Sequence, residues 1–191
     1  WLSGELSTER TIASTSGMLN VESGDWDLEL LRELGLPTHM LGPISDPGTS
    51  LGLLRPEIAQ LAGIEHGVQV ILPASHDTAS AVAAIPVTDN ERSWAYLSSG
   101  TWSLLGAELQ HHFVSAESCA APFTNERGIA GTVRFLKNIG GLWLVQELRR
   151  EWKQRGEEYS FAELANEARK ADAFRTLIDP NDSRFSAPGE M

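Results

Sequence analysis

The feature that most restricts the fold is a strand-like run, a polar loop and a helix of very small residues that follow one another between residues 68 and 84. Val68–Leu72 has the length and the apolar content of a buried strand. The loop reads Pro-Ala-Ser-His-Asp-Thr, and Ala79–Ala84 begins a helix whose small side chains permit close packing. Strand, loop and helix in this order predict a unit that places polar side chains at the carboxyl end of a strand. We therefore expect an α/β fold with its chemistry in this loop.

The acidic charge of the chain excludes two classes of partner. The 191 residues carry a formal net charge of -11, whereas a nucleic-acid surface needs clustered Lys and Arg to displace counterions. An anionic lipid surface likewise attracts basic segments, and no run of about 18 apolar residues predicts a membrane span. We therefore expect neither nucleic acid nor a membrane as a partner, and the oligomeric state is left open.

Cysteine and histidine usage fits a cytoplasmic protein without a metal site built from its own side chains. Cys119 is the only cysteine, which excludes an intrachain disulfide and a CxxC metal motif. A single thiol fits the reducing cytosol. The pair His111 and His112 has no third ligand near it in the sequence, so we interpret both as surface residues.

A polar, turn-rich segment divides the chain into two halves. Pro86–Arg92 (PVTDNER) has the composition of a linker between domains. We place the domain boundary there and predict a first domain over residues 1–90 and a second domain over residues 91–191.

Periodicity and end signals predict the remaining elements. The expected helices begin near Asp25, Pro56, Leu142 and Ser160, the last with a capping box formed by Ser160 and Glu163. The expected strands are Gly17–Val21, Ser93–Ser98, Trp102–Leu109 and Thr132–Leu136, and Pro43–Gly52 is expected to be a loop. The charge-rich stretch from Glu147 to Glu158 predicts a solvated face.

One candidate catalytic group lies in the loop before the small-residue helix. The carboxylate of Asp77 can reach into a cleft and accept the proton of a hydroxyl group that attacks a phosphorus atom. The alternative is that Asp77 only caps the helix that follows, a position that Asp commonly fills. The residue alone leaves both interpretations open.

A glycine-containing turn further along the chain is a candidate phosphate contact. In Leu97–Ser103 (LSSGTWS), the missing side chain of Gly100 lets backbone N–H groups approach phosphate oxygens, and the Thr101 hydroxyl adds a donor. An ordinary hairpin turn explains the same residues.

A second glycine pair offers further nucleotide contacts. In Lys137–Gln146 (KNIGGLWLVQ), Asn138 lies at a strand-to-helix junction and Gln146 lies more than one turn into the helix. Both could face a nucleotide above the junction. The alternative is a glycine-softened turn followed by a solvated Gln.

Together these stretches resemble the FGGY family of carbohydrate kinases, and within it the rhamnulokinase branch. The resemblance rests on SHDTASAV, YLSSGTWSLLG and LKNIGGLWLVQELRREW in this order, with SGDWDLELLRELGLP upstream and LIDPNDSRFSAPGEM at the end. It covers nearly the whole chain. It implies an actin-like/RNase H-like two-domain sugar kinase fold, of which this chain represents the end of domain I and the start of domain II, with the active site between the domains.

The resemblance also implies roles for individual residues. Asp77 matches the general base, and His76, Asp77 and Thr78 match the group that binds the sugar. The residues that match ATP contacts are Gly100, Thr101, Asn138 and Gln146. The implied reaction transfers the γ-phosphate of ATP to the 1-hydroxyl of L-rhamnulose, with Mg2+ offsetting phosphate charge. The implied cofactors are ATP and Mg2+, and the implied partners are a small-molecule sugar and ATP.

The family has segments with no counterpart in these 191 residues: an N-terminal phosphate hairpin, a glycine-rich adenine segment and part of the sugar pocket. We therefore expect this chain alone not to turn over, and we attribute the kinase activity to a longer protein. Two alternatives stay open. The substrate could be another ketose or a polyol, because the Asp and Gly-Thr elements serve every member of the family. The chain could also be a non-catalytic fragment or binding module.

Overall fold

The computed structural model describes residues 1–64, 67–87, 93–185 and 187. Its chain forms two compact units, the first comprising Trp1–Tyr96 and Gly106–Leu136 and the second comprising Leu97–Leu105 and Lys137–Met191. Most of the predicted boundary segment Pro86–Arg92 lies outside the described residues. Within the described ranges, no helix combines the length and the apolar character needed to cross a membrane.

The first unit contains two short strand pairs. Strand β1 (Thr8–Glu9) pairs in parallel with β2 (Ile44–Ser45), and β3 (Ser50–Leu53) pairs antiparallel with β4 (Gln69–Ile71). The prediction of a loop over Pro43–Gly52 is therefore wrong, because that stretch contains β2 and the start of β3. Such short strands show no alternating pattern long enough to be recognised.

The first unit also contains short helices. They are α1 (Arg10–Ala13), η1 (Ser14–Ser16), α2 (Leu28–Glu33), α3 (Pro56–Ala62), α4 (Asp77–Ala83) and α5 (Ala116–Ala120). The helix expected to begin near Asp25 is α2, whose N-cap is Asp27, and Pro56 occupies the first position of α3, as predicted. Helix α4 begins at Asp77, two positions earlier than the expected start at Ala79.

Two strand predictions need correction. Gly17–Val21 is not a strand: Leu19 makes an isolated bridge with Trp26, and the Asn20 side chain accepts hydrogen bonds from the turn that follows. Val68–Leu72 contains β4, but this strand is not buried, since the exposed fraction of Ile71 is 49%. It belongs to a two-stranded sheet, which leaves much of its surface in solvent.

A four-stranded sheet has the order β5-β6-β8-β7. Its strands are β5 (Tyr96–Ser99), β6 (Ser103–Leu109), β7 (Phe123–Arg127) and β8 (Val133–Ile139). The predicted hairpin of β5 and β6 and the predicted strand β8 are confirmed, whereas β7 and α5 escaped the sequence reasoning. Gly106 packs against β8 so closely that a Cβ there would lie 2.7 Å from the Cβ of Leu136, so this close approach requires glycine.

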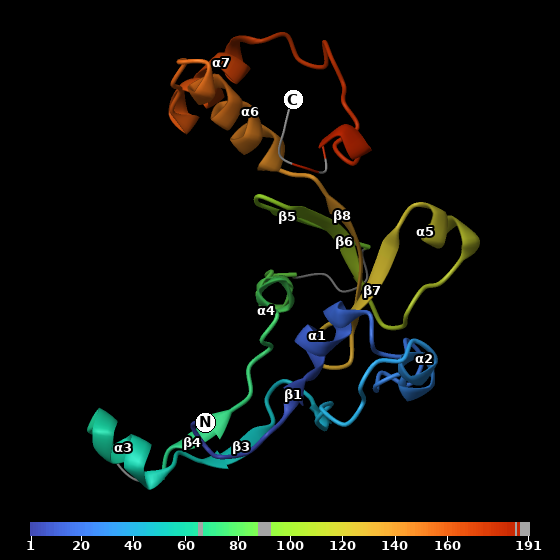
Figure 1. The fold of residues 1–191 in the computed structure, drawn as a ribbon, viewed down its shortest axis with the longest axis vertical. Helices are drawn as coiled ribbons and strands as arrows, with labels where there is room; N and C mark the ends of the chain where they lie inside the picture. Colours follow the sequence, from blue (N-terminus) through green and yellow to red (C-terminus); the bar gives the residue numbers. More distant parts are fainter. Residues whose placement is uncertain (65–66, 88–92, 186, 188–191) are drawn as a thin grey trace. The chain divides into compact units, whose positions relative to one another are not determined.

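The second unit contains α6 (Trp143–Gln154), α7 (Phe161–Lys170) and η2 (Ser183–Phe185). Figure 1 shows α6 and α7, in orange, as neighbouring helices, and the apolar side chains of both line one groove. The predicted capping box at Ser160 and Glu163 is confirmed. The predicted solvated face is wrong for Glu147 and Glu151, which are only 6% and 9% exposed. Both carboxylates pair with arginines of the same helix or its C-cap, so their burial does not leave bare charges.

Candidate active site

The loop before α4 is held in place by a buried glutamate at the start of α1. Glu9 is 3% exposed. Its Oε2 accepts hydrogen bonds from the Ser75 backbone N–H at 3.0 Å and the Ser75 hydroxyl at 2.8 Å, and its Oε1 accepts one from the Thr11 N–H at 2.7 Å. The backbone N–H of His76 donates to Thr11 Oγ1 at 3.2 Å. The α1 segment therefore fixes the backbone just before the candidate catalytic residue, and sequence reasoning missed this.

The charge of Glu9 depends on these hydrogen bonds. Burial opposes ionisation of the carboxyl group, but the hydrogen bonds from Thr11 and Ser75 outweigh burial and lower its pKa below 4.5. The ionised form is thus the one that the folded loop prefers.

We expect this preference to appear in the pH dependence of stability. A carboxyl pKa that is lower in the folded state contributes stability that is complete above pH 4.5 and lost as the pH falls through the folded pKa. Glu9→Gln should lower Tm at pH 7, and the difference from wild type should shrink towards pH 3. Thermal unfolding between these pH values measures it, with the exposed turn residue in Glu22→Gln as the matched control. A difference that stays constant with pH would contradict the role given to Glu9.

The His76 ring lies among charged side chains from three strands and from helix α4. Its Nδ1 is 3.0 Å from Nη2 of Arg134 and 3.8 Å from Oε2 of Glu126, and its Nε2 is 3.8 Å from Oδ1 of Asp77. Burial, together with the nearby guanidinium of Arg134, lowers the pKa of His76 below 6.5, against the opposing effect of Glu126, Asp77 and Glu9. The neutral imidazole is therefore the main form at neutral pH.

Arg134 is a fully buried charge of the first unit. It lies on β8 with an exposed fraction of 0%, and its Nη2 forms an ion pair with Oε2 of Glu126 on β7 at 2.9 Å. The carbonyl oxygen of Arg127 lies 3.4 Å from Nε and Nη2 of the same guanidinium. Sequence reasoning missed Arg134 and Glu126; an arginine within a run of buried strand residues is the one signal that points to them.

Asp77 presents its carboxylate to solvent at the first residue of α4. The side chain is 96% exposed, and Oδ1 accepts hydrogen bonds from the backbone N–H of Thr78 at 2.6 Å and from its hydroxyl at 3.3 Å. The N-cap residue of α4 is His76, which makes no side-chain cap hydrogen bond. Asp77 is therefore the first residue of the helix and not its N-cap residue, the position that the alternative to a catalytic role assigned to it. Its carboxylate is accessible to a ligand.

The Gly100–Thr101 turn of the second unit is joined to the start of α6. The backbone N–H of Leu142 donates to the Gly100 carbonyl at 2.9 Å, and that of Trp143 donates to the Thr101 carbonyl at 3.0 Å. The side-chain amide of Gln146 donates to Thr101 Oγ1 at 3.1 Å. The structure thus brings together Gly100, Thr101 and Gln146, and it places them in a different compact unit from His76–Thr78.

Asn138 lies at the end of β8, where Asn181 holds the junction with α6. The Asn181 side chain accepts from the Gly140 N–H at 3.1 Å and donates to the Asn138 carbonyl at 3.5 Å. A Cβ at Gly140 would lie 2.6 Å from the Pro180 carbonyl oxygen. The terminal segment around Asn181 therefore shapes the junction, which sequence reasoning did not foresee.

The described residues do not form a metal centre by themselves. No three His, Cys, Asp or Glu side chains gather closely enough within the described ranges to hold an ion.

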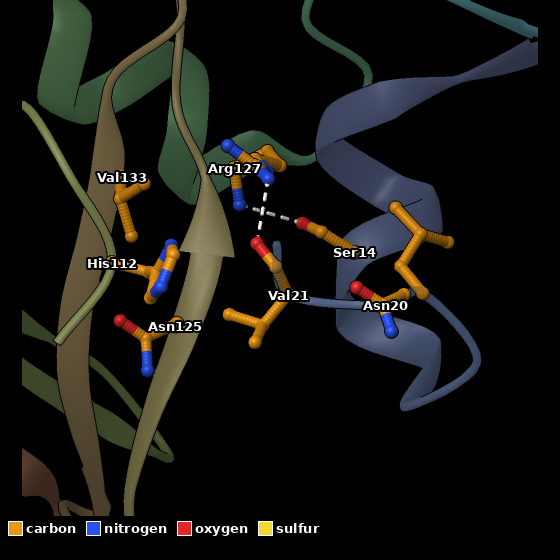
Figure 2. A pocket seen from close by; sticks show the side chains of 8 residues that line it. Ser14, Asn20, Val21, His112, Asn125, Arg127 and Val133 are labelled. Carbon is orange, nitrogen blue, oxygen red and sulfur yellow. Dashed lines mark hydrogen bonds between the residues drawn. The ribbon is translucent and has the colours of Figure 1, made fainter. Parts of the chain in front are cut away.

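A small cavity of the first unit is lined in part by Arg127 and Val133, the chain neighbours of Glu126 and Arg134. Figure 2 shows Arg127 between two partners: its backbone N–H donates to Ser14 Oγ and its Nη2 donates to the Val21 carbonyl, both at 2.8 Å. The cavity beside them has a volume of about 30 Å³. A small-molecule site usually has about 300–1,000 Å³, so this cavity is too small for a sugar or a nucleotide.

Comparison with known proteins identifies both halves of the chain. Residues 1–84 match the N-terminal domain, and residues 95–191 match the C-terminal domain, of the FGGY family of carbohydrate kinases. Curated rhamnulokinases of Bacteroides thetaiotaomicron and Bacillus subtilis are 43% and 41% identical to it over 190 residues, or 100% of this chain. The chain spans 38% of the length of each of these relatives.

Solved structures confirm the predicted fold class. A xylulose kinase from Lactobacillus acidophilus superposes on 90% of this chain and 34% of its own, with a TM-score of 0.69 and 22% identity. A gluconate kinase from the same organism gives a TM-score of 0.67, with 22% identity and the same coverage of both chains. The chain therefore has the actin-like, two-domain α/β fold of sugar kinases, in part.

Proposed function

Because the chain belongs to the FGGY family of carbohydrate kinases, we propose that the longer protein containing it, the parent protein, transfers the γ-phosphate of ATP to the 1-hydroxyl of L-rhamnulose. The observation that supports L-rhamnulose as the substrate is the 43% identity to a curated rhamnulokinase across the whole chain. Likeness to the xylulose and gluconate kinases rests on 22% identity and supports the fold alone.

Asp77 is the general base in this proposal. Its carboxylate accepts the proton of the sugar 1-hydroxyl as that oxygen attacks the γ-phosphorus, and the bond from this phosphorus to the bridging oxygen of ADP breaks. The 96% exposure of the Asp77 side chain supports this role, because a base must come within about 3 Å of its proton donor. His76 and Thr78 join Asp77 in binding the sugar.

Gly100, Thr101, Asn138 and Gln146 bind ATP in this proposal. The hydrogen bond from Gln146 to Thr101 Oγ1 supports it. A hydroxyl group that accepts a hydrogen bond retains its own hydrogen for donation, here to a phosphate oxygen. When bound, Mg2+ would offset the negative charge of the phosphates.

The family matches also support a domain organisation for the chain, and its cysteine usage supports a cellular location. We propose a sugar-side domain over residues 1–90 and a nucleotide-side domain over residues 91–191, supported by the interval between the two family matches at residues 84 and 95. We also propose a cytoplasmic location, supported by the single, exposed thiol of Cys119.

A substrate panel tests the proposed function. We expect the parent protein to produce ADP with L-rhamnulose at a kcat/KM at least about 100-fold above that with L-fuculose, D-xylulose or gluconate, because misplaced hydroxyl groups leave polar groups of the site unpaired. ADP formation with one of the other compounds and none with L-rhamnulose would show a different FGGY kinase. No phosphorylation of any of them would favour a non-catalytic binding module.

A further inference from the structure

We propose that Arg134, supported by Glu126, is a positioning residue that holds the His76 ring in the tautomer with its proton on Nε2, the nitrogen nearer to Asp77. The proposal rests on the proposed function and deepens it, since it adds two residues to the sugar-binding group. That group, as matched by sequence, consists of His76, Asp77 and Thr78. Arg134 lies 58 residues from His76 in the sequence.

The tautomer follows from the chemistry of the contact. A guanidinium group has N–H donors and no acceptor, and Nη2 of Arg134 lies 3.0 Å from Nδ1 of His76. Nδ1 must therefore accept the hydrogen bond. A neutral imidazole has one donor and one acceptor nitrogen, so the proton of His76 lies on Nε2.

Burial makes this contact persistent. Arg134 has no exposed surface, and the side chain of Glu126 is 12% exposed and lies 2.9 Å from the guanidinium. An arginine in this position cannot turn to water without separating a buried ion pair, which is strongly unfavourable. The charged groups that face the ring are Arg134 from β8, Glu126 from β7, Glu9 from β1 and Asp77 from α4.

The tautomer determines how the Nε2 side of the His76 ring can contact a sugar. Nε2 is 3.8 Å from Oδ1 of Asp77, which is too long for a direct hydrogen bond. A sugar hydroxyl oxygen that donates to the Asp77 carboxylate can accept from this Nε2–H at the same time. Arg134 thus determines that His76 offers a donor, and not an acceptor, beside the base.

The tautomer can be measured without any substrate. In parent protein labelled with 15N-histidine, long-range 1H–15N correlation spectra at pH 7.5 should show His76 with a protonated Nε2 and an unprotonated Nδ1, with assignment by loss of the signal in His76→Gln. A proton on Nδ1 in the wild-type protein would overturn the proposal, whether or not any variant folds.

Arg134→Lys tests the link to function. Lysine keeps the charge but loses the planar donor geometry, so we expect a mixture of His76 tautomers and a fall in kcat/KM for the sugar of about 10- to 100-fold, with KM for ATP unchanged. Arg169→Lys, at an exposed position of α7, is the matched control. An unchanged tautomer and unchanged kcat/KM in Arg134→Lys would overturn the role of Arg134. If the wild-type tautomer is as expected but no sugar is phosphorylated, the proposed function fails and the tautomer assignment stands.

Discussion

Replacing Asp77 by Asn in the parent protein should lower kcat for the sugar by about 10²- to 10⁴-fold, the usual contribution of a general base. The Asn amide has nearly the size and shape of the carboxylate but cannot take the proton of the attacking hydroxyl. The side chain is exposed, and it accepts hydrogen bonds from the adjacent Thr78, so we expect the fold and the Kd for ATP to be preserved. Steady-state kinetics and titration with ATP measure the two effects separately.

A matched control distinguishes the loss of a catalytic group from the loss of any carboxylate in the first turn of a helix. Glu57 is also acidic, exposed and in the first turn of a short helix, α3. Glu57→Gln should leave kcat within about 2-fold of wild type, since surface substitutions have small effects. Parallel loss of kcat and ATP affinity in Asp77→Asn would instead indicate that Asp77 is a structural residue.

Replacing Gly141 by Ala should disable the nucleotide side of the parent protein. A Cβ at this position would lie 2.6 Å from the Gly100 carbonyl oxygen and still closer to Ser103 Oγ. The Gly100–Thr101 turn must then move away from α6, which would disrupt the hydrogen bonds from Leu142 and Trp143 to that turn. We expect overpacking to cost about 1–3 kcal/mol of stability and misplacement of the turn to raise KM for ATP by about 100-fold.

Gly42→Ala is the control for the added methyl group. A Cβ at Gly42 meets Thr8 Oγ1 at 3.7 Å, an ordinary contact distance, so we expect Tm and KM for ATP to stay near the wild-type values. Denaturant unfolding and the ATP dependence of the initial rate compare the two variants. If Gly141→Ala binds ATP as well as Gly42→Ala, the turn is not part of the nucleotide site.

Short sequence signals predicted the parts of the fold that depend on interactions between residues close together in the sequence. Pro56 at the start of α3 and the Ser160–Glu163 capping box of α7 act within one turn of chain, so the sequence alone reveals them. Strand β2 depends on a partner that is distant in the sequence, since Ile44 pairs with Thr8. Its stability comes from that pairing, which no short window of sequence contains.

The residues of the candidate site likewise divide into those that a contiguous stretch of sequence reveals and those whose partners are distant in the sequence. Asp77 stands out because the strand, loop and helix around it are contiguous. Glu9 reaches Ser75 across 66 residues, and Arg134 reaches His76 across 58. These buried charges were unpredictable because a charged residue is expected at the surface unless its partner is known, and here the partner lies on another element.

The most direct test of the central claim is a crystal structure of the parent protein with L-rhamnulose and a non-hydrolysable ATP analogue. The account predicts an oxygen of the Asp77 carboxylate about 2.6–3.2 Å from the sugar 1-hydroxyl oxygen, with the Gly100–Thr101 turn at the phosphates. A 1-hydroxyl group bound by a different carboxylate, with Asp77 directed away from the sugar, would contradict it.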